Sequence, residues 1–134
     1  LHLRVGGRYD DYSQDSLNRA NGTRTRLADT KFSPQAGLVF DVAGGVSVYA
    51  GYGQGFRPNS GADAAGRAFE PEESESYEVG AKFALGDGAL TGTVALFALE
   101  KTNVLTADPL NAGFSLAIGA EESRGLELDV AGRL

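Results

Sequence analysis

One stretch, residues 74–103, constrains the fold more than any other, because its side chains alternate with a period of two around a tight turn. In the first arm, residues 74–85, apolar side chains from Tyr77 onward take the odd positions, and mostly polar or small ones take the even positions. This pattern is typical of a β-strand with one apolar and one polar face. The connector Gly86-Asp87-Gly88 contains an Asp-Gly pair, which can adopt the positive φ angles of a tight hairpin. The second arm is therefore predicted to lie antiparallel to the first.

The same alternation recurs along the rest of the chain. It predicts six strands in total, at residues 1–10, 30–42, 46–56, 74–85, 89–103 and 114–134. Pro34 favours a strand end or a bulge in the second segment, because proline cannot donate a hydrogen bond to a ladder. The 19 glycines also argue against helices, in which glycine is disfavoured. We therefore predict an all-β fold of antiparallel up-and-down strands without a helix.

The connections between these strands alternate in length. Residues 11–29 and 57–73 are predicted to be long polar loops and residues 104–113 a third loop, whereas residues 43–45 and 86–88 form short turns. Up-and-down strands then place every short turn at one end of the sheet and every long loop at the other. Outer-membrane barrels have this asymmetry, with short periplasmic turns and longer extracellular loops. The strands are also long enough to cross a bilayer, which takes about 9–11 tilted residues.

Aromatic side chains on the apolar face gather toward the two ends of the strands. Those near the long-loop ends are Tyr9, Phe32, Tyr52, Phe56, Tyr77 and Phe114. Phe40 and Phe83 lie near the short turns, and aliphatic residues such as Leu38, Val48 and Val79 lie between the two groups. Two aromatic bands around an aliphatic belt are typical of side chains at the two interfaces of a membrane. A soluble β-sandwich also alternates, but it has no reason to sort aromatic residues to its strand ends.

The predicted six strands are too few for a closed transmembrane barrel, because bacterial barrels begin at about eight strands. An open edge in hydrocarbon would leave backbone N–H and C=O groups unpaired. The chain is therefore predicted to be a segment of a large transmembrane outer-membrane β-barrel. Residues 1–134 begin without Met, a basic segment or an apolar segment, so we expect a partial barrel domain without a signal peptide.

The composition excludes several classes of protein. No run of about 18 apolar residues is present, so a membrane protein built of helices is excluded. The net charge of −6 and the lack of a Lys or Arg cluster argue against a nucleic-acid partner. Without Cys, neither a disulfide nor a thiolate metal site can form. His2 is the single histidine, which rules out a metal site of several histidines.

Five short motifs follow one another along the chain. They are Tyr-Ala-Gly-Tyr-Gly-Gln-Gly-Phe-Arg-Pro-Asn (49–59), Phe-Glu-Pro-Glu (69–72), Ser-Tyr-Glu-Val-Gly-Ala-Lys-Phe (76–83), Lys-Thr-Asn-Val-Leu-Thr-Ala-Asp-Pro (101–109) and Ser-Arg-Gly-Leu-Glu-Leu-Asp (123–129). In this order and spacing they resemble the barrel of TonB-dependent siderophore receptors, and in particular the ferrichrome receptor branch. Each motif is moderately specific alone, and the series of five covers nearly the whole chain.

The resemblance implies a part in the import of ferric siderophores, with the hydroxamate type as one expectation, across the outer membrane of a Gram-negative bacterium. Such receptors are not enzymes, and their barrels have about 22 strands and a plugged lumen. The implied partners are the ferric siderophore, the lipid bilayer, a plug domain and the TonB complex. The family's plug domain and TonB box are not found in residues 1–134, so the chain is expected to be barrel wall only.

The resemblance carries over no site residue, so the substrate-binding residues stay unknown, and the residues themselves suggest no catalytic, cofactor-binding or metal site. Arg57 could attract an anionic ligand near Phe56, Phe69 and Phe114, which also lie at loop ends. Interface anchoring or loop support is the simpler interpretation of these four residues.

Two further clusters also have simpler interpretations. An acidic group could suggest a divalent-cation site, but without the spacing of a calcium loop it favours a solvated loop. Its members are Asp63, Glu70, Glu72, Glu73 and Glu75. Gly51, Gly53 and Gly55 superficially resemble a phosphate loop, but they lie inside a predicted strand with no following helix.

If the chain is barrel wall, its polar face lines the lumen and contacts a plug, because a charged residue facing lipid at the midplane costs about 2–4 kcal/mol. This face comprises Arg4, Arg8, Gln35, Asp41, Glu78, Lys82, Glu127, Asp129 and Arg133. The long loops are then expected to form the outer vestibule that captures the ligand. Two alternatives stay open. One is a secreted or periplasmic β-sandwich that binds carbohydrate or protein, and the other is a small structural barrel or adhesin that pairs its open edges.

Overall fold

A computed structural model describes residues 1–17, 19, 22 and 24–133 and contains six β-strands, with no helix among these residues. The strands are β1 (His2–Leu17), β2 (Arg24–Ala43), β3 (Val46–Arg57), β4 (Glu72–Leu85), β5 (Leu90–Ala107) and β6 (Ser115–Gly132). This part of the chain offers no helix long and apolar enough to cross a membrane. The prediction of an all-β fold with six antiparallel strands is confirmed.

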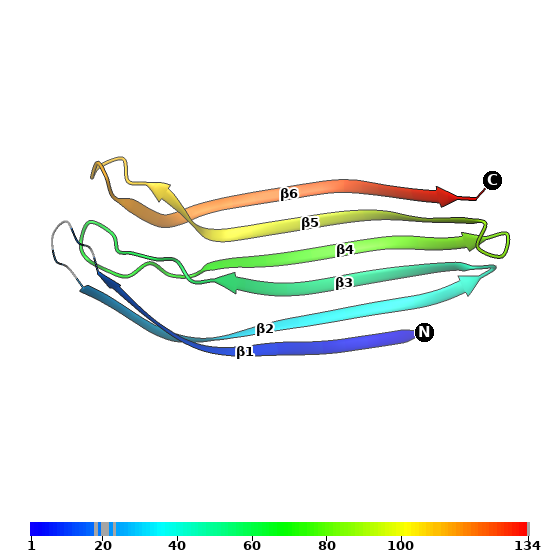
Figure 1. The fold of residues 1–134 in the computed structure, drawn as a ribbon, viewed down its shortest axis with the longest axis horizontal. Coiled ribbons are helices and arrows are strands. Elements are labelled where there is room, and N and C mark those ends of the chain that lie inside the picture. The colour runs from blue at the N-terminus through cyan, green and yellow to red at the C-terminus, as the bar shows by residue number, and fades with distance from the viewer. Residues whose placement is uncertain (18, 20–21, 23, 134) are drawn as a thin grey trace.

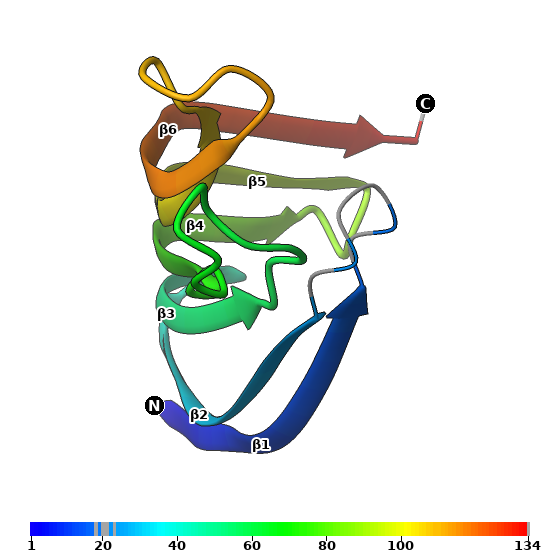
Figure 2. The ribbon, with the colours of Figure 1, turned by 90° about the vertical axis from the view of Figure 1, so that its left-hand side faces the viewer.

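The strands form one sheet in the order β1-β2-β3-β4-β5-β6, and every neighbouring pair is antiparallel. The two short turns and both termini lie at one end of the sheet, and the longer connections lie at the other (Figure 1). Seen along the strands, the sheet curves into an open arc (Figure 2). The predicted segregation of short turns and long connections is therefore confirmed.

The turn between β4 and β5 has the backbone conformation that its sequence predicts. Gly86, Asp87 and Gly88 have positive φ angles of 60°, 54° and 80°, and the Ala89 N–H donates to the Gly86 carbonyl at 3.0 Å. Aspartate is one of the few residues besides glycine that tolerate this region of φ. From this turn the two strands pair along nearly their whole length, so the predicted hairpin is confirmed.

The sequence predicts a loop over residues 11–29, and this prediction is wrong over most of the range. β1 continues to Leu17 and β2 begins at Arg24, and the two strands pair throughout. The residues there are polar on both faces, so they show no apolar alternation. A hairpin that projects into water needs none, because backbone hydrogen bonds join its two strands. β5 also runs beyond its predicted end at Asn103, to Ala107, because it stays paired with β6 there.

β2 and β3 separate toward the long-loop end of the sheet (Figure 1). Their ladder ends at the Gln35–Gly53 pair, although β2 stays paired with β1, and β3 with β4, beyond that point. Pro34, which has no N–H to donate, is the next residue of β2. Pro34 lies inside β2 and is paired in register with Gly7 of β1, so the expectation of a strand end or a bulge at this residue is wrong. On the β3 side, however, β2 is unpaired from Pro34 toward the long-loop end. The separation opens a wedge between β2 and β3.

The large apolar side chains of the strands are exposed. Val79 is 51% exposed and Leu128 is 67% exposed, and few apolar residues in the described part of the chain are buried, among them Phe69, Pro71 and Ala95. A soluble sheet of this size would bury such side chains under a second layer, whereas the described strands form a single sheet. The β-sandwich alternative is therefore wrong.

Two aromatic rings on the polar face lie over glycines of the adjacent strand. A Cβ atom at Gly80 would come within 2.7 Å of the Tyr49 ring, and one at Gly125 within 2.6 Å of the Phe97 ring. Both are direct cross-strand pairs. An aromatic side chain that covers a glycine in this way stabilises a sheet. This packing explains why an apolar residue such as Phe97 occupies the polar face.

Candidate functional site

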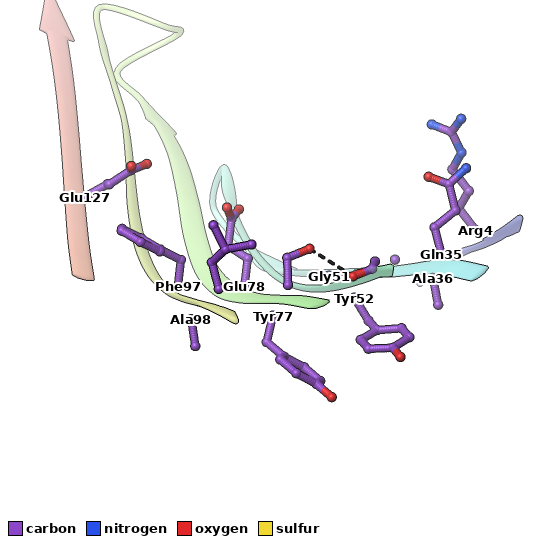
Figure 3. A pocket seen from close by; sticks show the side chains of 14 residues that line it. Arg4, Gln35, Ala36, Gly51, Tyr52, Tyr77, Glu78, Phe97, Ala98 and Glu127 are labelled. Atoms are coloured by element: carbon purple, nitrogen blue, oxygen red, sulfur yellow. Dashed lines mark hydrogen bonds between the residues drawn. The ribbon is translucent and has the colours of Figure 1, made fainter. Parts of the chain in front are cut away.

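The concave face of the arc carries the polar side chains. Figure 3 shows Arg4, Gln35, Glu78 and Glu127 on this side of the sheet, whereas the ring of Tyr77 projects from the opposite, convex side. Strand alternation extends this division to the remaining positions of each strand. The candidate functional site is therefore sought on the concave face and in the connections at its long-loop end.

A hollow of about 610 Å³ lies in the middle of the concave face. Its floor is bare, since a Cβ atom at Gly51 would meet no neighbouring heavy atom within 4 Å. Its lining includes Arg4, Glu78 and Glu127 (Figure 3). None of these three side chains forms an ion pair with another residue in the described ranges. Their charges thus face the inside of the arc uncompensated by this part of the chain.

A second hollow, of about 460 Å³, lies on the same face at the wedge between β2 and β3. Gly53, Gly55 and the buried Ser33 contribute small residues to its lining, which keeps it open. Its charged lining consists of Arg8, Arg57, Lys101 and Glu72. Three cations and one carboxylate therefore converge on this hollow, in a sequence whose net charge is −6.

Glu72 is the buried member of this charged group, with 8% of its surface exposed. One carboxylate oxygen accepts a hydrogen bond from Nη2 of Arg57 at 2.7 Å, and the other lies 3.8 Å from Nζ of Lys101. Nζ of Lys101 is also 3.8 Å from a carboxylate oxygen of Glu121. A buried carboxylate needs partners of this kind, because an unpaired charge is costly to desolvate.

Arg8 is held on the opposite side of the second hollow. Its Nε donates to the carboxylate of Asp10 at 2.7 Å, and its Cζ lies 5.8 Å from the centroid of the Phe56 ring. The ring of Tyr12 packs against Phe56 with the centroids 5.4 Å apart. Phe56 therefore lines the second hollow, and the prediction that it belongs to the outward aromatic band is wrong. The separation of β2 from β3 explains its different environment.

The connection between β3 and β4, residues 58–71, is held to β5 by two asparagines. Nδ2 of the buried Asn59 donates to the backbone carbonyls of Glu70 at 2.8 Å and Asn103 at 2.9 Å. Nδ2 of Asn103 donates to the Pro71 carbonyl at 3.0 Å. Asn103 has a φ of 56°, a left-handed conformation that asparagine tolerates. These bonds fix the connection beside the strand ends that line the second hollow.

Two loop aspartates organise the backbone around them. Asp63 accepts hydrogen bonds from the backbone N–H and the guanidinium group of Arg67, and these bonds lower the pKa of its carboxyl group. Asp108 accepts from the side-chain amide of Asn111, and from the backbone N–H groups of Leu110 and Asn111, which lowers its pKa as well. In both cases the bonds favour the ionised carboxylate.

A third hollow, of about 790 Å³, lies between the long-loop ends of β1 and β2 and the connections that follow β3 and β5. Leu17, Phe69, Phe114 and small residues between positions 60 and 66 contribute to its lining. Phe69 is buried and so supports the loop, whereas Phe114 stays exposed. Of the four loop-end candidates from the sequence, Arg57 and Phe56 thus meet at the second hollow, and Phe69 and Phe114 meet at the third.

The acidic residues considered for a cation site do not converge, because most of them have separate partners. These partners are Arg57 for Glu72, Lys31 for Glu73, Tyr52 for Glu75 and Arg67 for Asp63. Within the described ranges, no group of three or more His, Cys, Asp or Glu side chains could hold a metal ion. Gly51, Gly53 and Gly55 lie inside β3, as predicted, so they form no phosphate loop.

Sequence reasoning did not bring Arg8 and Lys101 to the same hollow as Arg57. They come from β1, β5 and β3, and no local motif joins them. The usable signal was strand parity, because all three positions fall on the polar face. Parity alone does not say which polar residues lie side by side.

A family model described as "TonB dependent receptor-like, beta-barrel" matches residues 1–134. The chain belongs to this family. Among curated relatives, the metal-pseudopaline receptor of Pseudomonas aeruginosa is 40% identical over 136 residues, and the ferrichrome outer membrane transporter/phage receptor of Escherichia coli is 37% identical over 130 residues. Each match covers 97% of this chain but only 19% and 17% of the respective relative.

Solved structures of outer-membrane receptors have a similar fold. The alcaligin outer membrane receptor of Bordetella pertussis superposes with a TM-score of 0.76 and 28% identity, over 99% of this chain and 24% of that chain. The pyoverdine outer membrane receptor of Pseudomonas aeruginosa, solved bound to pyoverdine, gives a TM-score of 0.76 and 27% identity, over 97% of this chain and 20% of that chain. The chain thus spans about a fifth of the length of the proteins that it matches.

As part of a TonB-dependent receptor barrel, the six strands form a segment of transmembrane wall in the outer membrane of a Gram-negative bacterium. The exposed apolar side chains of the convex face meet lipid, and the concave face lines the lumen. TonB-dependent receptors are receptors and transporters and not enzymes.

Proposed function

We propose that this chain forms part of the barrel wall of an outer-membrane receptor that imports ferric siderophores, including siderophores of the hydroxamate type. The observation that carries the proposal is the match of the whole chain to the receptor barrel family, with a ferrichrome transporter among the relatives. In this proposal residues 1–134 are all barrel wall, and the plug domain and the TonB-contacting segment come from other parts of the parent receptor.

The charges of the concave face support a plug as a partner. Arg4, Glu78 and Glu127 line the central hollow and have no ion-pair partners among the described residues. Charged groups inside a protein are normally paired. A plug that fills the lumen would supply the opposite charges, two of them cationic and one anionic, while energy from the TonB complex would move it.

Uptake of radioactive iron by living cells tests the proposal. The cells are given a set of ferric siderophores that includes ferrichrome and ferrioxamine B. Deletion of the parent gene is expected to abolish iron uptake from at least one of them. Restoration of the complete gene is expected to restore that uptake, but only in cells that keep their TonB complex. Unchanged uptake of every siderophore after deletion, or uptake that persists without TonB, would contradict the proposal.

A further inference from the structure

The second hollow is the most unusual feature of the lumenal wall, because the sheet itself opens there. The β2–β3 ladder stops at Gln35–Gly53 and leaves a wedge, and Gly53 and Gly55 offer no side chains to fill it. The resulting space of about 460 Å³ is within the range of small-molecule sites, about 300–1,000 Å³. It opens toward the lumen at the long-loop end, which is the side from which a ligand arrives.

The guanidinium groups at this hollow have unused donors. Arg8 uses Nε for Asp10, and Arg57 uses Nη2 for Glu72. No other hydrogen bond joins these two groups to the described residues, and the Arg57 side chain is 73% exposed. Each arginine therefore presents further N–H groups on a side chain that is already held in place, by Phe56 for Arg8 and by Glu72 for Arg57.

The charged side chains of the lining and their unused donors indicate the kind of ligand. Arg8, Arg57 and Lys101 carry three positive charges, and Glu72 carries the one negative charge of the lining. Asp10 pairs with Arg8 and Glu121 lies beside Lys101, so carboxylates outside the lining offset this charge. The unused guanidinium N–H groups, and not a net positive charge, therefore indicate the ligand. The planar guanidinium group of arginine binds carboxylates through paired, charge-assisted hydrogen bonds.

We propose that the hollow lined by Arg8, Arg57 and Lys101 is a subsite for a free carboxylate of the ferric chelate. The inference rests on the proposed function, and it adds a ligand preference that the family membership does not supply. In this arrangement the iron-binding groups of the chelate stay outside the hollow. The carboxylate enters it and accepts hydrogen bonds from Arg8 and Arg57, while Lys101 stays beside Glu72.

The test uses two chelates that share one iron-binding core. N-succinyl ferrioxamine B ends in a free carboxylate, and N-acetyl ferrioxamine B ends in a neutral amide. Binding of each is measured with the purified complete receptor in detergent. We expect the wild type to bind the succinyl form about tenfold more tightly or better, as two charge-assisted hydrogen bonds predict. The preference should shrink as salt is added, because salt screens charge.

Three variants test whether the preference for the succinyl chelate arises at the second hollow. Arg8→Gln together with Arg57→Gln should abolish the preference while leaving affinity for the acetyl form unchanged. Arg8→Gln alone should reduce it and keeps the test valid if the double variant does not assemble, because the Asp10 partner of Arg8 lies on the same strand. Arg26→Gln is the matched control, since Arg26 lies near the hairpin tip, away from the hollow, and its exposed pair with Asp15 is unrelated to it. This control should keep the wild-type preference.

The other outcomes overturn the inference. They are binding of neither chelate by the wild type, equal binding of both, an equal loss of both in the Arg8 and Arg57 variants, or the same loss of preference in Arg26→Gln. An equal loss of both would instead indicate that these arginines hold a plug carboxylate or the wall itself. If cells still import iron from any siderophore in a TonB-dependent way, the proposed function stands although the carboxylate subsite fails.

Discussion

The middle of the sheet and its long-loop end are stabilised in different ways. In the middle, the convex face exposes Val48, Val79, Leu96 and Leu128, and this region buries little besides Ala95. At the long-loop end, by contrast, Asn59, Phe69, Glu72 and Asp108 are buried. Asn59, Glu72 and Asp108 are also hydrogen-bonded to neighbouring residues there.

The two regions are therefore suited to different solvents. The middle has no interior of its own, so its apolar face gains its free energy from lipid, while the backbone ladders satisfy the peptide groups. The long-loop end lies in water, where side-chain hydrogen bonds and one buried ring hold its turns. We therefore expect substitutions in the middle to block membrane assembly, and substitutions at the loop end to loosen the vestibule without blocking assembly.

The largest effect is expected from Val79→Arg, which would place a charge in the apolar middle of the convex face. A cation on the lipid-facing side at the midplane costs about 2–4 kcal/mol, so the complete receptor should fail to assemble in the outer membrane. Assembly is measured as the fraction of receptor that resists trypsin and migrates as a folded barrel. Lys82→Arg, at a lumenal position of the same strand, is the matched control and should assemble normally. If both variants assembled equally well, the assignment of the two faces would be wrong.

A smaller effect, confined to the loop end, is expected from Asn59→Ala. It leaves the carbonyls of Glu70 and Asn103 without their donor, at a cost of about 1–3 kcal/mol. The receptor should assemble, but residues 58–71 should be cleaved faster by an external protease and exchange backbone hydrogens faster. Gln14→Ala is the control, because Gln14 also bonds to this connection, at Ser60, through an exposed contact. Equal protection of the loop in wild type and Asn59→Ala would rule out the asparagine anchor.

The smallest effect is expected from acid at Asp108. Its pKa is lowered in the folded state by bonds from Asn111 and Leu110, so its contribution to loop stability is complete above the ordinary aspartate pKa of about 3.9. The contribution is lost as the pH falls through the lower, folded-state pKa. As the pH falls through that lower pKa, the amides of Leu110 and Asn111 should lose protection from hydrogen exchange after correction for the intrinsic pH dependence.

The control for this pH effect is the amide of Ala89, whose acceptor is the backbone carbonyl of Gly86 and does not titrate. Its protection should stay constant over the same pH range. The Asp108→Asn variant should show weaker protection of residues 110 and 111 at neutral pH and no further loss in acid. Wild-type protection of residues 110 and 111 that stayed constant from neutral pH until Asp108 is fully protonated would contradict the part assigned to the carboxylate.

Much of the fold could be predicted from the sequence where lipid imposes a strict rule. Alternation from Tyr77 to Leu85 and the sequence Gly86-Asp87-Gly88 predicted the central hairpin correctly, and the turn has the expected positive φ angles. The prediction failed over residues 11–29 and at Phe56. Both lie where the wall leaves the membrane or the sheet splits, so the side chains there no longer follow the two-face pattern.

By itself, the sequence determined the strand number, the order of short and long connections, and which face of the wall meets lipid. These features follow from a period of two and from the need to keep charge out of hydrocarbon, and both can be counted along a single strand. The tertiary structure alone decided that Arg8, Arg57 and Lys101 surround one hollow, and that Asn59 reaches β5. Register, sheet curvature and the early end of the β2–β3 ladder set these contacts between distant strands, and no local pattern encodes them.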